Sequence, residues 1–192
     1  MAEPTTRFRL IPQDTAVADL NTEAKRLGSI TGQSVVSTGD GNEVDFGTID
    51  ISAGAANSGV KTVLWDVTAD GGNTAVEAFK LWLSEKGFDQ AGSKIKLQPL
   101  SGGDQATPSD TENYELNAGV GDYTWGDMPE SEPGSQNIFP SDEGASMVLD
   151  TASDDAIMWA MYAAIAENET TGTYKGTTTD YELQFSLKYS YS

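Results

Sequence analysis

The chain has 192 residues, of which 38% are hydrophobic and 20 are glycine, and this suits one sizeable core built from short strands and turns. It contains neither cysteine nor histidine, which excludes disulfides, thiol nucleophiles, zinc sites with nitrogen or sulfur ligands and imidazole chemistry. The formal net charge is −19, and the span from Lys96 to Lys175 holds 15 carboxylates and no further basic residue. Such an acidic surface repels phosphates, so nucleic acid is not an expected partner.

The first 30 residues are predicted to form an N-terminal arm, helical or extended. The segment TTRFRLI, residues 5–11, has the composition of a short strand or an extended arm, with Arg7, Phe8 and Arg9 as candidate interface residues. Residues 14–27 carry apolar side chains at helical spacing, which predicts a short helix or a structured arm there. The segment contains no apolar core of a secretory signal, and no stretch of the chain approaches the 18 apolar residues of a membrane-spanning helix.

The hydrophobic period changes to two from about residue 33. The pair Asp40-Gly41 lies between β-branched runs in SVVSTGDGNEVDFGTIDI, which predicts a hairpin. The next run, KTVLWDVT, places Val63, Trp65 and Val67 on one face of a strand, and the glycine-rich TADGGNT that follows predicts a turn. The sequence therefore predicts a β-rich domain over residues 31–192.

Two segments are compatible with either a helix or a strand. Residues 76–88 alternate apolar and polar side chains between glycine turns, which favours a strand, and SKIKLQPL repeats the alternation. Residues 155–166, DAIMWAMYAAIA, contain good helix formers but are followed by a polar turn and a further strand. We prefer a strand that is apolar on both faces and therefore buried within a sheet.

The C-terminal segment YELQFSLKYSY gives the strongest secondary-structure signal in the chain. Eleven residues alternate without a break, which predicts an amphipathic strand with its apolar face in the core. Because it comes last, this strand is a candidate for a sheet edge at which a further subunit begins, and Tyr189 and Tyr191 are candidate interface residues.

Residues 101–145 are predicted to form a long acidic loop inserted into the domain. The stretch contains four of the seven prolines, and loops of this length are often functional or ordered by a neighbour. It includes Tyr123 and Trp125, which would face the same side of a short strand. This pair is a candidate subunit contact or a platform for a sugar ring.

No catalytic constellation stands out among the 30 acidic residues, so the chain is not expected to be an enzyme. No cofactor is expected. Calcium is the ion that suits the composition best, since it takes oxygen ligands. Two groups of side chains are close enough in sequence for this: Asp40, Asn42 and Asp45, and Asp150, Asp154 and Asp155. Both also fit the ordinary use of Asp in turns.

Two passages resemble immunoglobulin-like β-sandwich modules of bacterial, archaeal and phage surface proteins. VDFGTIDISAGAANSGVKTVLWDVTADGGNTAVEAFKL is similar to their pattern of a strand, a small loop, a strand, a Gly/Asn turn and a strand. IMWAMYAAIAENETTGTYKGTTTDYELQFSL is similar to their ending, with a G-T-Y-x-G turn before the last strand. The resemblance implies an all-β antiparallel sandwich, Ig-like or jelly-roll, in an exposed structural setting.

These observations together predict a non-catalytic structural protein of a phage virion, such as a decoration protein or another surface component of the head or tail. It would assemble through its arm and edge strands, with copies of itself or with other virion proteins. One alternative is a subunit of an extracellular filament or surface layer. The other is a carbohydrate-binding module that uses Tyr123 and Trp125.

Overall fold

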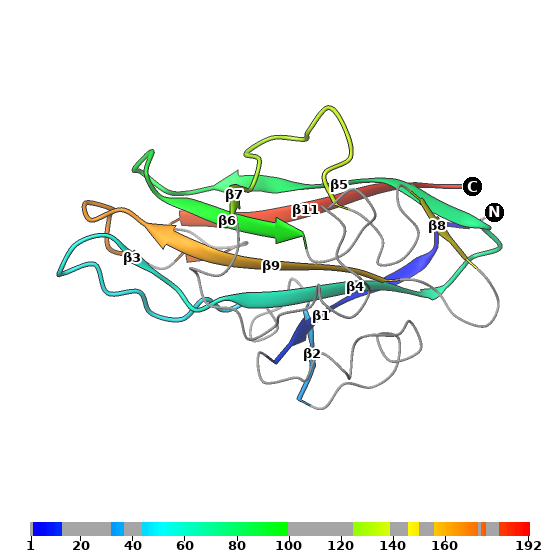
Figure 1. Ribbon diagram of the computed structural model, residues 1–192, viewed down its shortest axis with the longest axis horizontal. Helices are drawn as coiled ribbons and strands as arrows, with labels where there is room; N and C mark the ends of the chain where they lie inside the picture. The colour runs from blue at the N-terminus through cyan, green and yellow to red at the C-terminus, as the bar shows by residue number, and fades with distance from the viewer. Residues whose placement is uncertain are drawn as a thin grey trace.

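The computed structural model describes residues 2–12, 32–36, 44–99, 125–138, 146–149, 156–172, 174–175 and 181–192. In this part of the chain all regular secondary structure is β, in two sheets that pack face to face (Figure 1). Every strand pair is antiparallel except the short contact between β10 and β11. None of the described residues belongs to a helix that is long and apolar enough to cross a membrane.

The larger sheet has the strand order β2-β1-β4-β9-β6-β7, and β3 pairs with the end of β9. The central strand β9 is flanked on both sides and is buried on both faces over most of its length, which confirms the predicted strand at 155–166. The strands of this sheet are β1 Thr5–Ile11, β2 Ser34–Val36, β3 Ala56–Asn57, β4 Lys61–Ala69, β6 Lys94–Pro99, β7 Gly126–Asp127 and β9 Ala156–Ile165.

The smaller sheet has the order β10-β11-β5-β8. Its long central pair joins β5 to β11, so the predicted strands at 76–88 and at the C-terminus are both confirmed. The strands are β5 Ala75–Lys86, β8 Ser146–Val148, β10 Tyr174–Lys175 and β11 Tyr181–Tyr191.

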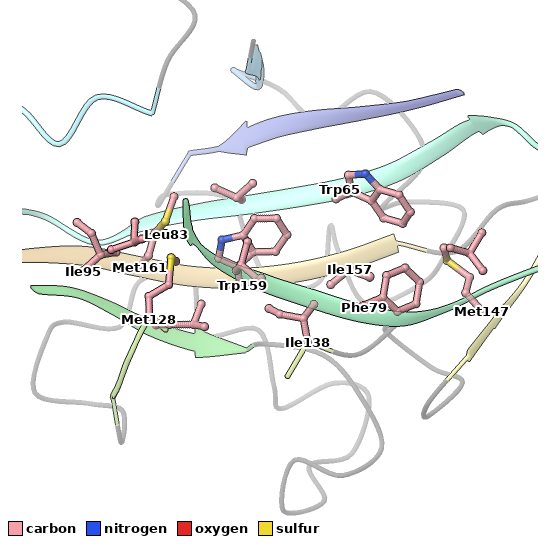
Figure 2. Close-up of a cluster of buried hydrophobic side chains, with 14 of the residues drawn as sticks. Trp65, Phe79, Leu83, Ile95, Met128, Ile138, Met147, Ile157, Trp159 and Met161 are labelled. Carbon is pink, nitrogen blue, oxygen red and sulfur yellow. The ribbon is translucent and has the colours of Figure 1, made fainter. Parts of the chain in front are cut away.

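The main core lies between the two sheets (Figure 2). Trp65 of β4 and Trp159 of β9 are fully buried, and Trp65 meets Phe79 of β5 edge-on at 5.6 Å. Alternate residues of β11 pack against this cluster, and they are Leu183, Phe185, Leu187 and Tyr189. Burial of such large apolar side chains, each contributing about 1.5–3 kcal/mol, is the dominant stabilising term.

The sequence TADGGNT forms the predicted turn, which connects β4 to β5, and both ends of the described chain are attached to it. Ala2 donates its N–H to the carbonyl of Gly71 (3.0 Å), and Thr74 donates to the carbonyl of Ser192 (2.6 Å). Gly71 has a φ of +66°, and a Cβ there would lie 2.6 Å from the carbonyl oxygen of Ala2. The turn therefore requires glycine at this position, because only glycine allows both the backbone angle and the close approach.

The described part of the N-terminal region contains a strand. Residues 5–11 form a strand between β2 and β4, the first of the two alternatives, whereas the helix expected over 14–27 lies outside the described residues. The predicted hairpin is wrong in its second half, since residues 44–55 form no strand. Asp45 and Asp50 instead accept hydrogen bonds from the N–H groups of Gly47 (2.7 Å) and Ser52 (2.9 Å), and such Asx turns bend the chain.

Candidate functional site

The three N-terminal candidate residues make their described contacts within the chain. Arg9 is fully buried, and its Nη2 lies 3.3 Å from Oδ2 of Asp66, which is also 2.8 Å from Nη2 of Arg7. The hydrogen bond to Asp66 raises the pKa of Arg7, whereas burial lowers the pKa of Arg9. Phe8 packs edge-on against Trp159 with ring centroids 6.2 Å apart. An interface role for these three residues stays a prediction.

Of the two aromatic residues expected to form a platform, the structure describes only Trp125. Its ring meets Tyr162 of β9 edge-on, with centroids 4.8 Å apart, on the face of the larger sheet that points away from the main core. Tyr123 lies outside the described residues. The geometry therefore places Trp125 in a packing contact and leaves the sugar platform a prediction.

The expected calcium ligands lie outside the described residues, apart from Asp45. Oδ1 of Asp45 accepts a hydrogen bond from the N–H of Gly47. Within the described ranges, no group of three or more acidic side chains is arranged to hold a metal ion.

A segment that the sequence showed only as part of a long loop covers one side of β5. Residues 128–138, here called the strap, begin and end with the fully buried side chains of Met128 and Ile138. Pro129 accepts a hydrogen bond from the N–H of Leu83 (2.8 Å), and Asn137 donates its own N–H to the carbonyl of Phe79 (3.1 Å). The strap thus satisfies backbone groups of β5 that would otherwise form an open edge.

The side chain of Asn137 completes this pairing. Its Oδ1 accepts the N–H of Leu81, and its Nδ2 donates to the carbonyl of the same residue, both at 2.8 Å. An amide side chain here makes the same two hydrogen bonds that a neighbouring strand would make. The only signal of the strap in the sequence is an apolar residue at each end of a polar, proline-containing stretch.

Two carboxylates of the strap form ion pairs with lysines from both sheets. Glu132 lies 3.3 Å from Nζ of Lys80 and 2.9 Å from Nζ of Lys188, two lysines that are direct cross-strand neighbours. Glu130 pairs in the same way with Lys86 and Lys94. The hydrogen bond from Lys188 lowers the pKa of Glu132, and the bond from Lys86 lowers that of Glu130. Glu132 therefore offsets the repulsion of two facing lysines.

The opposite side of the smaller sheet, along β11, is arranged differently. In an antiparallel pair, residues alternately exchange hydrogen bonds with the partner strand and point away from it. Leu81 directs its N–H and C=O to Asn137, so Leu187, which lies opposite, directs its own away from β5. The N–H of Leu83 likewise faces the strap. The backbone N–H and C=O of its partner Phe185 therefore point away from β5.

We call the outward backbone of Leu183–Tyr191 the β11 edge. On that side β10 pairs only with Tyr181 and Glu182. Among the described strands, none pairs with the β11 edge. Alternate residues of this nine-residue stretch thus direct their backbone N–H and C=O groups outward. The sequence predicted the strand, whereas its role as the edge for a further subunit stays a prediction.

The two candidate tyrosines of β11 have different surroundings. The Tyr189 ring packs on Trp65 at 5.1 Å, and burial raises the pKa of its hydroxyl. Tyr191 is 43% exposed at the end of the same strand. Of these two tyrosines, Tyr191 is therefore the more accessible one beside the β11 edge.

The sequence matches no protein-family model, and no curated protein matches it.

Proposed function

We propose that this chain is a non-catalytic structural protein that assembles through the β11 edge, as a surface component of a phage virion. Its two sheets would then be an Ig-like or jelly-roll sandwich. The observation that carries the proposal is the difference between the two sides of the smaller sheet. One side is covered by the strap and β8, whereas among the described strands none pairs with the other side beyond Glu182.

An open edge is a template for another strand, and natural proteins usually cover it or shorten it. Here β5 receives a dedicated cover that includes a side-chain replacement for strand pairing. The β11 edge is nine residues long and contains no proline. Addition of a strand to such an edge is a common mode of protein association, with backbone hydrogen bonds supplying affinity.

The described carboxylates support a structural role. A general acid in an enzyme needs a raised pKa. The pKa values of Glu130 and Glu132 are instead lowered by their lysine partners, and Asp66 is held by two arginines. The paired lysines therefore favour the ionised forms of Glu130 and Glu132. The virion setting is supported by the sequence resemblance alone.

Electron microscopy of the purified protein and of its native source tests the proposal, together with light scattering over a range of concentrations. We expect self-association or incorporation into particles. Tyr191→Pro removes a backbone N–H that points outward, since neighbouring Ser192 is the residue that exchanges hydrogen bonds with Ala75. It should weaken association about fivefold for each outward N–H lost at the contact, as expected for a hydrogen bond of about 1 kcal/mol.

Tyr191→Ala is the matched control, because it removes the same ring and keeps the N–H. A larger weakening with proline than with alanine supports the backbone contact. A protein that stays monomeric at every concentration and is absent from particles contradicts the proposal.

A further inference from the structure

We propose that the partner at the β11 edge is a second copy of this chain, paired antiparallel about a two-fold axis at Leu187. This inference rests on the proposed function and names its partner and register. In such a dimer, the smaller sheets of the two copies form one continuous sheet across the contact. A two-fold contact is closed, so it uses the open edges of both copies at once.

The position of the axis follows from the length of the available edge. β10 occupies the edge at Tyr181 and Glu182, which leaves Leu183–Tyr191 for a partner. The midpoint of this segment is Leu187, so an axis there pairs its whole length. Leu187 also directs its N–H and C=O outward, as required of a residue that exchanges both bonds with its own copy.

The side chains in this register are complementary. On the core face, Phe185 lies opposite Tyr189 of the second copy, an aromatic pair of the kind that stabilises sheets. On the other face, Gln184 lies opposite Ser190, and Ser186 lies opposite Lys188. An axis at Lys188 would instead bring two lysines face to face, which is unfavourable.

Charge also favours a second copy at this edge. Two chains with a net charge of −19 repel each other over most approaches. The segment from Leu183 to Tyr191 contains a single charged residue, Lys188, and no carboxylate. Two copies can therefore meet along this strand without placing carboxylates against each other.

Disulfide trapping in the full-length protein tests the register, and the natural chain has no cysteine to interfere. Gln184→Cys and Ser190→Cys are prepared as single variants and mixed under mild oxidation. In the proposed register their Cβ atoms are about 4.5–5.5 Å apart across the contact, close to the reach of a disulfide. Two cysteines at position 184 would be about 20 Å apart, from six residues at about 3.3 Å each.

We expect the mixture to form a disulfide-linked dimer, and each variant alone to form little. Ser84→Cys is the matched control, because Ser84 occupies the same solvent-facing side of the smaller sheet but one strand further from the edge. It should not cross-link. Reversible denaturation of each reduced variant confirms that the substitution has not unfolded the chain.

The outcomes separate this inference from the proposed function. Efficient cross-linking of Ser186→Cys with itself would indicate an axis at Ser186 and overturn the register. Assembly without any cross-link along β11 would overturn the second copy as partner at this edge, while the structural role would remain. A lone monomer, absent from every particle, would overturn both.

Discussion

The pairing between Asn137 and Leu81 gives a sharp test of how the smaller sheet is closed. Asn137→Ala removes the acceptor for the N–H of Leu81 and the donor to its carbonyl, each a bond of 2.8 Å. The backbone of β5 would lose its partner at this point. We expect the variant to fold with a lower free energy of unfolding and to expose part of a second edge.

The magnitude follows from the two bonds and their surroundings. A hydrogen bond contributes about 0.5–1.5 kcal/mol net, and a buried group left without a partner costs about 1–3 kcal/mol. Leu81 is fully buried, whereas Asn137 is only half-buried, so water reaches the vacated position in part. We therefore expect a loss of about 2–3 kcal/mol, a large fraction of the 5–15 kcal/mol typical of a domain.

Asn137→Asp separates the donor from the acceptor. The introduced carboxyl still accepts from the N–H of Leu81, but its ionised form cannot donate to the carbonyl. Folding then favours the neutral form and raises the pKa of the carboxyl above the value of about 3.9 that it has in the unfolded chain. The stability of this variant should be highest below that value and should fall as the pH rises through the raised pKa.

Urea denaturation followed by tryptophan fluorescence measures both variants, because Trp65 and Trp159 are fully buried in the folded state. Asn168→Asp is the matched control, since Asn168 is exposed in a turn and should tolerate the change. A loss below about 0.5 kcal/mol for Asn137→Ala would refute the idea that the amide replaces a strand. Parallel pH dependence of the two aspartate variants would refute the donor role.

Two further predictions concern β5 and the strap. Ala78 has a φ of +60° at a bulge opposite β11, so Ala78→Gly should stabilise the fold by about 0.5–1 kcal/mol, with Ala75→Gly destabilising as a control. Urea denaturation measures both, and equal effects would contradict strain at Ala78. The lowered pKa of Glu130 means that its pairing with Lys86 and Lys94 stabilises the fold above pH 4.5, its ordinary value, and is lost as the pH falls through the lowered pKa. The deficit of Glu130→Gln should therefore vanish in acid, and a deficit independent of pH would contradict this pairing.

The strands with clear periodicity could be predicted because their pattern is local. β11 alternates over its full length, and β5 does so across a bulge at Ala78, which shifts the register without hiding the apolar face. β9 has no alternation, and its prediction as a strand and not a helix depended on the polar turn that follows it. In each case the information lies in neighbouring residues, which is what a sequence displays directly.

Contacts between distant residues could not be predicted in the same way. Asn137 and Leu81 are 56 positions apart, and a side-chain amide that imitates a strand leaves no period in the sequence. Arg9 alternates with apolar neighbours as a surface residue would, yet it is buried because Asp66 compensates its charge from β4. The hairpin expected around Asp40-Gly41 lacks its second strand because Asp45 and Asp50 bond to the local backbone instead.

An ion pair between Glu132 and Lys188 links the strap to β11. A lysine on an edge strand ordinarily discourages association, because its charge would have to approach that of a neighbour. In this chain Glu132 of the strap lies within 3.0 Å of Nζ of Lys188 through both carboxylate oxygens. The same carboxylate reaches Lys80 on β5, so Lys188 is held toward the interior of the sheet and away from the open side. In the proposed assembly, the strap would close one edge of the smaller sheet and neutralise the lysine at the other, so a partner strand would add at β11 rather than at β5.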